Sequence, residues 1–423
     1  MSDPVLPVFK RVDISFESGK GSWLSTRDGE RYLDFASGIA VNSLGHNHPH
    51  LIKSVKAQLG KLWHTSNLVR IPEGERLARR LTDATFADVA FFVNSGGEAN
   101  ETAVKMARRF HSASGSPEKF RIVTFAGAFH GRSLAMIAAT GYQPYLNGFG
   151  PRVDGFDQVR LDDWEALDRA ITPETAAILL EPIQGEGGLR CVAPETLRRL
   201  REICDRRGLL LILDEVQSGA GRTGRFLAHE WSGIAPDIAT LAKGIGGGFP
   251  VGVCLATQEA ATGMTAGTHG TTFGGNPLAM SACHAVLDIV LNDAFLRRVL
   301  KMGQILNDGL QRIALNHKDI VAGVRGAGLL QGLRMRSAAP VFVDLLRSQH
   351  LLAVPARDNV VRFAPPLTVL PGEITQALKR IAKAADMLRE EQSRSPRKMP
   401  AARTIPVTIV EANSLPEDLR PSA

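Results

Sequence analysis

Apolar runs alternate with amphipathic stretches through the middle of the chain. Residues 209–213 and 175–180 are two runs of strand length, and they end in the carboxylates of Asp214 and Glu181. Such runs are typical of strands that are buried on both faces of a sheet. Pro194–Arg207 has a helical pattern. The alternation of strands with helices predicts an α/β fold in which helices cover both faces of a mainly parallel sheet.

Shorter apolar pieces mark both ends of the chain. Residues 12–37 alternate them with glycines, which predicts a small antiparallel meander. Apolar residues recur at every fourth position from His50 to Leu62, which predicts an amphipathic helix. Near the carboxyl end, a strand pattern with a glycine turn at 324–333 lies among predicted helices at 277–292, 339–349 and 372–391.

These patterns suggest how the chain is divided. We predict an N-terminal segment of a small domain at 1–60, a large domain at 61–315 and a C-terminal part of the small domain at 316–392. The tail at 393–423 is rich in proline, serine and basic residues, so it is predicted to be disordered. Within the tail, residues 405–410 have the pattern of a short edge strand.

Composition describes a soluble globular chain. Its 423 residues are 44% hydrophobic and 22% charged, and this length favours two domains. The net charge of +7 is mostly dispersed, and the core shows no basic patch interleaved with aromatic residues, so we expect no nucleic-acid partner. No apolar stretch approaches the length of a bilayer span, and the amino terminus lacks a signal pattern. We therefore expect a cytoplasmic location and no membrane contact.

Cysteines and histidines show no metal-binding pattern. The four cysteines, at 191, 204, 254 and 283, fall singly, so neither a zinc site nor a disulfide framework is expected. His46 and His48 lie two residues apart without a further ligand cluster. Turn or interface histidines are the expected case, and no metal is predicted.

The first chemical candidate is Lys243, which ends a short apolar run and is followed by glycines. Partial desolvation would lower the pKa of such a lysine, and its neutral amine could then condense with a carbonyl. An isolated Lys-Gly pair is more often a surface lysine before a turn. Here Asp214 ends the neighbouring strand pattern, at the sheet edge where ligands bind in open α/β folds. Lysine and carboxylate together are what pyridoxal phosphate requires, one for the Schiff base and one for the ring nitrogen.

Two further loops carry candidate ligand groups. Ser95 and Glu98 match a capping box, and Gly96 and Gly97 leave the first amides of the helix unshielded, which suits a phosphate. An ordinary capped helix would have the same pattern. At 129–132, an aromatic ring beside a glycine and an arginine could stack on a planar ring and bind a carboxylate.

Several motifs occur in one order along the chain, and over residues 8–390 the chain resembles class III, fold type I, pyridoxal-phosphate-dependent aminotransferases. The motifs are Gly45-His-Asn-His-Pro, Asn94-Ser-Gly-Gly-Glu-Ala-Asn-Glu, Phe129-His-Gly-Arg, Glu181-Pro-Ile-Gln-Gly-Glu-Gly-Gly, Leu213-Asp-Glu-Val-Gln, Leu241-Ala-Lys-Gly, Thr271-Thr-Phe-Gly-Gly-Asn-Pro and Arg362-Phe-Ala-Pro-Pro-Leu. Within the family it is most similar to the acetylornithine aminotransferases, through Ile39-Ala-Val-Asn-Ser-Leu-Gly-His, Leu62-Trp-His-Thr-Ser-Asn and Gly267-Thr-His-Gly-Thr-Thr.

The resemblance implies a fold and an activity. The fold is a large pyridoxal-phosphate-binding domain with a mainly parallel seven-stranded sheet, plus a smaller α+β domain built from both chain ends. The activity is transfer of the terminal amino group of N2-acetylornithine, or a similar ω-amine, to 2-oxoglutarate. The products are N-acetylglutamate 5-semialdehyde and glutamate, in arginine biosynthesis. A homodimer with shared active sites is also implied.

The resemblance also implies the roles of individual residues. Lys243 would hold the cofactor through a Schiff base and move a proton, Asp214 would pair with the pyridine nitrogen, and Phe129 would stack on the ring. Gln217 would lie near the phenolic oxygen, and Thr272 would reach the phosphate in the other subunit. The implied cofactor-binding set is Ser95, Gly96, Gly97, Phe129, Asp214, Glu215, Val216, Gln217, Lys243 and Thr272.

For the substrate, the resemblance implies two arginine clamps. Arg362 would bind the α-carboxylate and pair with Glu186 when that carboxylate is absent, and Arg132 would bind the distal carboxylate. The implied substrate-binding set is Arg132, Glu186, Thr271, Arg362, Gly38 and Asn42. Ornithine-type relatives have a tyrosine at the position of Gly38, so glycine leaves room for an acyl group. A tight turn after Ser37 would also explain a glycine there.

Some positions depart from the family pattern, and several alternatives remain open. Gly97 stands where alanine or threonine is common, Phe273 stands where many relatives have tyrosine, and residues 355–359 replace a more glycine-rich turn before Arg362. The amino donor could be ornithine, succinylornithine, an N-acyl-diaminopimelate or 4-aminobutyrate, and an aminomutase is a further competitor. A non-catalytic protein of this fold would be expected to lose Lys243 or Asp214. A nicotinamide dehydrogenase would need a Gly-x-Gly-x-x-Gly motif that residues 244–249 do not complete.

Overall fold

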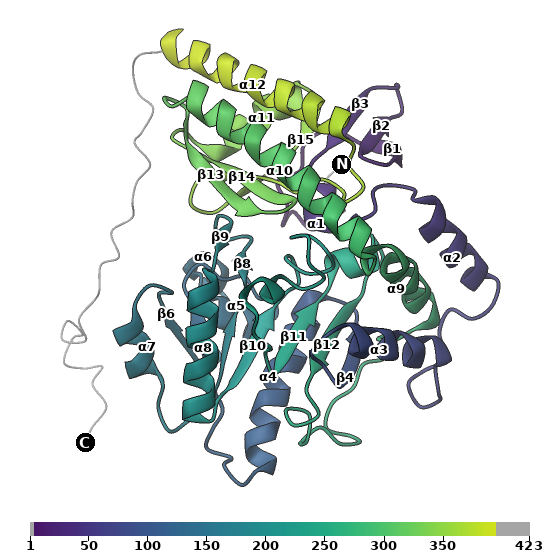
Figure 1. The fold of residues 1–423 in the computed structure, drawn as a ribbon, viewed down its shortest axis with the longest axis vertical. Coiled ribbons are helices and arrows are strands. Elements are labelled where there is room, and N and C mark those ends of the chain that lie inside the picture. Colours follow the sequence, from purple (N-terminus) through teal and green to yellow (C-terminus); the bar gives the residue numbers. More distant parts are fainter. Residues whose placement is uncertain (1–3, 395–423) are drawn as a thin grey trace.

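The computed structural model describes residues 4–394, and its centre is the predicted mainly parallel sheet (Figure 1). Seven strands are ordered β4-β12-β11-β10-β7-β5-β6. Their bounds are Val89–Val93, Gly252–Ala256, Ile238–Leu241, Leu210–Asp214, Thr175–Leu180, Arg121–Phe125 and Phe156–Val159, in that order. Only β12 runs antiparallel to its two neighbours within this sheet. The predicted α/β fold class is confirmed.

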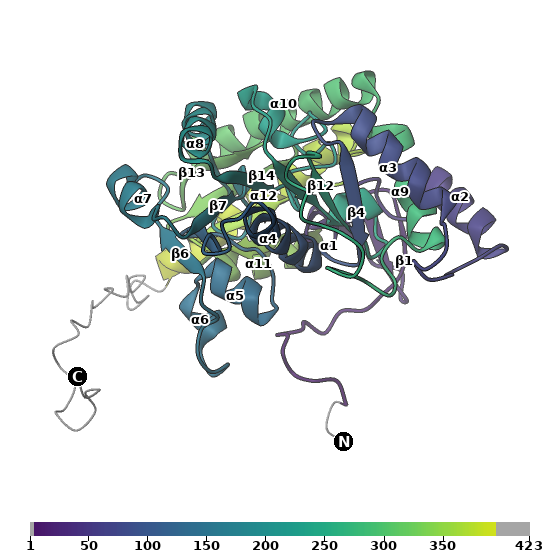
Figure 2. The same cartoon turned by 90° about the horizontal axis from the view of Figure 1, so that it is seen from below.

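Alternate residues of β7 explain why helices cover both faces of the sheet. Ala177 and Leu179 pack in one apolar cluster with α4 (Gly96–Ala113) and α5 (Leu134–Thr140). Ile178 and Leu180 pack on the other side with α7 (Trp164–Ala170) and α8 (Pro194–Arg207). Figure 2 shows α5 and α8 on opposite sides of the strands. A strand buried on both faces has no polar positions to alternate, which is why these runs are uniformly apolar.

The N-terminal meander is present, and it joins the C-terminal part of the chain. Its strands are β1 (Phe16–Lys20), β2 (Trp23–Thr26) and β3 (Arg31–Asp34), paired antiparallel. On its outer side β3 pairs in parallel with β15 (Leu351–Leu352). Segments from both ends of the chain thus share one four-stranded sheet.

A second four-stranded sheet forms the rest of the C-terminal region. Its order is β13-β14-β17-β16, with bounds Val321–Ala327, Leu330–Met335, Val360–Phe363 and Val354–Ala356. The strand pattern predicted at 324–333 is the hairpin of β13 and β14, which turns at Gly328 with φ of 57°. Figure 1 shows α10 (Asp293–Asn316), α11 (Ala339–Ser348) and α12 (Pro371–Arg394) at the top of the molecule. The edge strand predicted at 405–410 and most of the tail lie outside the described residues.

The remaining elements connect these sheets. They are α1 (Ser37–Ala40), α2 (Pro49–Leu59), α3 (Pro72–Ala84), α6 (Gln143–Leu146), α9 (Pro277–Val290), the hairpin of β8 (Ile183–Gln184) and β9 (Arg190–Cys191), and the 3-10 turns η1 (Ala228–Ser232) and η2 (Lys243–Gly246). Helix α2 ends three residues before the predicted Leu62, because Gly60 follows as its C-cap. Among residues 4–394 no single helix is long and apolar enough to span a membrane. Only α9 and α10 together meet those criteria, as a pair bent by 75°.

Candidate active site

A cavity of about 320 Å³ opens at the carboxyl ends of the parallel strands. Strands β7, β10 and β11 all end at this edge, which brings Glu181, Asp214 and Lys243 to one place although they are far apart in sequence. This is the edge at which open α/β sheets bind ligands. Eight of the residues predicted for the cofactor line the cavity: Ser95, Gly96, Gly97, Phe129, Asp214, Val216, Gln217 and Lys243.

Lys243 begins η2 directly after β11, with φ of 47° in the left-handed region. Within residues 4–394 its amine has no hydrogen-bond or ion-pair partner, although it lines the cavity. Burial lowers the pKa of Lys243, and the nearby Arg362 charge lowers it further, against the opposing effects of Glu186, Asp214 and Glu181. The lowered pKa makes the neutral amine, which is the form that condenses with a carbonyl, more accessible than in an exposed lysine.

Asp214 ends β10 with its side chain almost fully buried. Its Oδ1 accepts the N–H of Val216 at 3.0 Å, and its Oδ2 accepts Asn100 Nδ2 at 2.7 Å. The ring Nδ1 of His130 lies 2.8 Å from the same Oδ2. A buried carboxylate needs such partners to remain ionised. The arrangement therefore presents an oriented carboxylate to the cavity.

Asn100 and His130 belong to motifs quoted above, but no role was predicted for either residue. Asn100 comes from α4 and its Oδ1 accepts the hydroxyl of Thr240 at 2.6 Å, so the amide is fixed from both sides. His130 Nε2 is buried without a hydrogen-bond partner in the described chain, which favours the tautomer whose Nδ1–H donates to Asp214. One signal was available for Asn100: it is a polar residue within the apolar stripe of its helix.

Glu181 is a second buried carboxylate in the cavity wall. It accepts the N–H of Phe129 at 2.8 Å and that of Gly185 at 3.1 Å. Burial and the neighbouring Asp214 charge raise its pKa to about 7, although both backbone N–H groups oppose this. It thus fixes the backbone that carries Phe129. Sequence reasoning noted this carboxylate at its strand end but gave it no role.

The loop before α4 forms the predicted anion cradle. Ser95 Oγ accepts the N–H of Glu98 at 3.2 Å, and Glu98 reaches back to the N–H of Asn94. Only half of the predicted capping box is present, because Glu98 accepts the N–H of Asn94 and not that of the N-cap Ser95. The first N–H groups of an α-helix have no partner within the helix. A Cβ on Gly96 would lie 2.7 Å from Cγ1 of Val216, so only glycine lets this backbone approach the cavity floor. Such exposed amides suit a phosphate.

Arg362 and Glu186 lie together, as the resemblance implied. Arg362 Nη1 is 2.8 Å from Glu186 Oε1, and the arginine side chain is only 1% exposed. The same Nη1 donates to Gln217 Oε1 at 2.8 Å. The side-chain oxygen of Gln217 thus accepts from Arg362, while the residue also lines the cavity. Arg362 Nε is buried without a partner in the described chain, which leaves a donor for a carboxylate.

Arg132 is exposed and does not line the cavity. Its guanidinium carbon lies 3.8 Å from the centroid of the Tyr145 ring and 5.5 Å from that of Phe129. Cation–π contacts of this kind hold a guanidinium in place while leaving its N–H groups free to bind an anion. Tyr145 was missed, because α6 lies thirteen residues from Arg132 in a region without a recognisable motif.

Several predicted residues are not at the cavity in this chain. The prediction for Glu215 is corrected: its carboxylate accepts from Ser218 and from the backbone of His229, because the side chain after Asp214 points to the other side. Thr271 accepts from Asn94 Nδ2 at 3.3 Å, and Thr272 is exposed. Gly38 is exposed, and a Cβ on it would lie 3.4 Å from Asn42 Nδ2, with neither residue lining the cavity.

In the described part of the chain, no three His, Cys, Asp or Glu side chains could hold a metal ion together. His46 Nε2 instead lies 2.8 Å from Asp34 Oδ2. The residues present do fit pyridoxal phosphate. A lysine amine without a partner, an oriented buried carboxylate and a cradle that a Cβ on Gly96 would fill surround one cavity. Fold and site together define an α/β enzyme of the pyridoxal-phosphate-dependent class.

Comparison with known proteins gives the family. The model of the class-III aminotransferase family matches residues 8–385, so the chain belongs to this family, whose members depend on pyridoxal phosphate. The acetylornithine aminotransferase of Mesorhizobium japonicum is 60% identical over 377 residues, which cover 89% of this chain and 94% of that protein.

Two solved structures are similar throughout. An N-acetylornithine aminotransferase from Stenotrophomonas maltophilia has a TM-score of 0.79 and 36% identity, over 90% of this chain and 98% of that one. An ornithine aminotransferase from Toxoplasma gondii, with pyridoxal phosphate partly occupying its active site, has a TM-score of 0.87 and 30% identity, over 91% and 93%. The prediction of the family and of a transaminase is confirmed.

Proposed function

We propose that this chain transfers the terminal amino group of N2-acetylornithine to 2-oxoglutarate with pyridoxal phosphate as cofactor, giving N-acetylglutamate 5-semialdehyde and glutamate. This reaction belongs to arginine biosynthesis. The observation that carries the chemistry is the Lys243 amine without a partner, in one cavity with the buried Asp214 carboxylate. The choice of donor is supported by the name of the relative that is 60% identical.

When bound, pyridoxal phosphate supplies a carbonyl for the amine and a ring that accepts electrons. Lys243 would hold the cofactor, and its displaced neutral amine would take the proton from the carbon that bears the substrate nitrogen. Asp214, held by Asn100 and His130, would keep the pyridine nitrogen protonated. The N–H groups of Gly96 and Gly97 would bind the phosphate, and Phe129 would stack on the ring.

Two arginines would bind the carboxylates of 2-oxoglutarate and glutamate. Arg362 would take the α-carboxylate once Glu186 moves away, because its buried charge requires an anionic partner in either state. Arg132, stacked on Tyr145, would take the distal carboxylate.

Arg132→Lys is expected to weaken the half-reaction with glutamate or 2-oxoglutarate more than that with a monocarboxylate amine. A lysine cannot form the two parallel bonds of a guanidinium, and the loss should be about 1.5 to 3 kcal/mol in the free energy of transition-state binding. Rapid-mixing measurements of each half-reaction test this. Arg160→Lys is the matched control, because that exposed arginine pairs with Asp162. Equal loss in both half-reactions would remove Arg132 from this role.

The amino donor is tested at Gly38. This residue lies in a turn where Ser37, Gly38, Ile39 and Ala40 have φ values of 49°, 63°, 67° and 62°. Gly38→Tyr is expected to shift the ratio of kcat/KM values from N2-acetylornithine towards ornithine, since the tyrosine hydroxyl could meet the free α-amino group.

A side chain at Gly38 also costs about 1–2 kcal/mol of backbone strain. Gly38→Ala is therefore the control, because it carries the strain without the hydroxyl. The similar structure from Toxoplasma gondii is named an ornithine aminotransferase. If the wild-type protein also prefers ornithine to N2-acetylornithine, the proposed donor is wrong. If Gly38→Ala and Gly38→Tyr give the same ratio, the hydroxyl is not what selects the donor.

We propose a homodimer with shared active sites. The exposed side chains of Leu62, Trp63, Leu68 and Phe273 leave apolar surface uncovered in the single chain, and Thr272 is exposed beside the last of them. Exposed apolar surface of this kind is typical of an interface. Light scattering of the holoenzyme should give twice the mass of the chain, and a monomer that retains full activity would contradict shared sites.

A further inference from the structure

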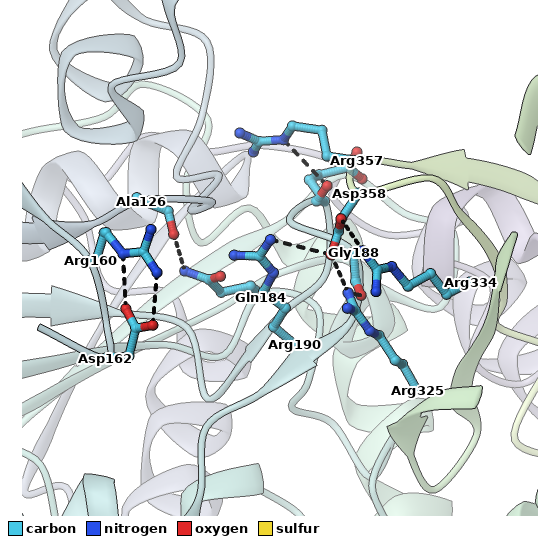
Figure 3. A network of polar contacts seen from close by, with 11 residues as sticks. Ala126, Arg160, Asp162, Gln184, Gly188, Arg190, Arg325, Arg334, Arg357 and Asp358 are labelled. Atoms are coloured by element: carbon cyan, nitrogen blue, oxygen red, sulfur yellow. Dashed lines mark hydrogen bonds and ion pairs between the residues drawn. The ribbon is translucent and has the colours of Figure 1, made fainter. Parts of the chain in front are cut away.

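Arg357 lies in the turn between β16 and β17, at the departure from the family pattern in residues 355–359 (Figure 3). Its guanidinium bridges two loops of the large domain. Nη2 donates to the carbonyl of Ala128 at 2.7 Å, and Nε donates to the carbonyl of Glu186 at 3.3 Å. The backbone N–H of Arg357 donates to the same Glu186 carbonyl at 2.9 Å. One residue therefore fixes the backbone next to Phe129 and the backbone of Glu186.

The neighbouring Asp358 holds the same loop from its other end. Arg325 Nη1 lies 2.7 Å from Asp358 and donates to the carbonyl of Gly188 at 3.1 Å. Arg190, at the end of that loop, pairs with Asp358 at 3.3 Å. Figure 3 shows these side chains converging on the Asp358 turn. The loop that carries Glu186 is thus bound to the turn at both of its ends.

This anchorage matters because Glu186 occupies Arg362. The Arg362 guanidinium is buried and its ion pair with Glu186 Oε1 spans 2.8 Å, whereas the Glu186 side chain is 22% exposed. A substrate carboxylate that is to pair with Nη1 of Arg362 has to displace this carboxylate. Since the backbone of Glu186 is held by Arg357, the displacement has to occur by rotation of the side chain.

An aromatic ring also holds the side chain of Arg357 in place. Its guanidinium carbon lies 4.5 Å from the centroid of Tyr142, and Tyr142 meets Tyr145 edge to face at 4.9 Å. The guanidinium of Arg132 in turn stacks on the Tyr145 ring. Arg357 is therefore bound by an aromatic ring as well as by two carbonyls, and a flexible or smaller side chain would not reproduce this bridge.

We propose that Arg357 is a positioning residue that keeps Glu186 over Arg362, and that it thereby sets the preference between substrates with and without a carboxylate at that arginine. The identities of these substrates rest on the proposed function. Without the Arg357 side chain, the bonds from Nη2 and Nε are lost and only the backbone N–H of residue 357 still holds Glu186, so the loop loosens and Glu186 leaves Arg362 more often. Dicarboxylates then bind more tightly, and amine donors that place no carboxylate at Arg362 bind more weakly.

The test uses holoenzyme of wild type and Arg357→Gly, with glutarate as the dicarboxylate probe in isothermal titration calorimetry. Arg357→Gly removes charged hydrogen bonds that hold the Glu186 loop, so Arg362 is more often accessible to glutarate. The Kd of glutarate should therefore fall by about tenfold. The KM of the amine donor should rise by a similar factor with little change in kcat. Arg357→Lys should recover part of the effect, because its ammonium can still donate to one carbonyl. Arg334→Ala is the control, since that arginine contacts Asp358 without touching the Glu186 loop.

Arg357→Gly and Arg357→Lys are repeated in a Glu186→Ala background, where Arg357 has no carboxylate left to position. There Arg357→Gly should leave the Kd of glutarate unchanged. An equal shift in both backgrounds, or no shift in the wild-type background, would overturn the proposal. Glutarate binding does not depend on the amino donor, so inactivity towards N2-acetylornithine with the expected glutarate shift would refute the proposed function alone.

Discussion

Lys243→Ala is expected to lower kcat by at least about 10⁴-fold. The neutral amine of Lys243 would both hold the cofactor and move the substrate proton, and no other lysine lines the cavity in the described residues. Borohydride reduction of the holoenzyme followed by peptide mapping should place a phosphopyridoxyl label on Lys243. The variant should lack this label.

Lys53→Ala is the matched control, because Lys53 is exposed on α2, away from the cavity. It should retain wild-type kcat and the label on Lys243. A label on a different lysine of the wild-type protein would show that the cofactor is held elsewhere. Turnover within tenfold of wild type in Lys243→Ala would show that another group moves the proton.

The sequence predicted the central sheet and the ends of its strands because their signal is local. In β7 and β10 the apolar run stops at a carboxylate, and a buried strand places that residue at the sheet edge whatever the rest of the chain does. The same holds for Ser95 and Gly96, where strand, cap and helix follow one another. Lys243 follows β11 just as directly.

Contacts between distant segments could not be predicted in this way. Arg357 donates to the carbonyl of Ala128, 229 residues away, and no local sequence pattern near either residue indicates this contact. Asn100 contacts Asp214, which lies 114 residues further along the chain. In the sequence, Asn100 is also compatible with an ordinary position on a helix face. The resemblance placed Glu215 in the cofactor-binding set, but its carboxylate accepts from Ser218 and His229, 14 residues further on in the latter case, and the strand pattern that ends at Asp214 does not indicate this contact.

Asp214→Ala is the second prediction with a large effect. The variant should still hold the cofactor on Lys243, because neither the amine nor the phosphate cradle involves this carboxylate. Its kcat should fall by about 10³-fold or more, since an unprotonated pyridine ring is a poor electron acceptor. Peptide mapping after borohydride reduction and steady-state kinetics separate these two outcomes.

The same substitution should also destabilise the fold. His130 Nδ1 would lose its acceptor in a buried place, and Asn100 Nδ2 would lose one of its two acceptors, keeping the carbonyl of His130. A buried donor left unsatisfied costs about 1–3 kcal/mol. Glu215→Gln provides the comparison, because Glu215 is the adjacent buried carboxylate and binds Ser218 and His229 on the other side. It should lower the free energy of unfolding while leaving kcat within a few-fold of wild type.

If Glu215→Gln lost activity as Asp214→Ala does, the carboxylates would matter for stability alone, and the role assigned to Asp214 would be wrong. A large loss confined to Asp214→Ala requires a chemical role for Asp214, which lines the cavity, whereas Glu215 does not.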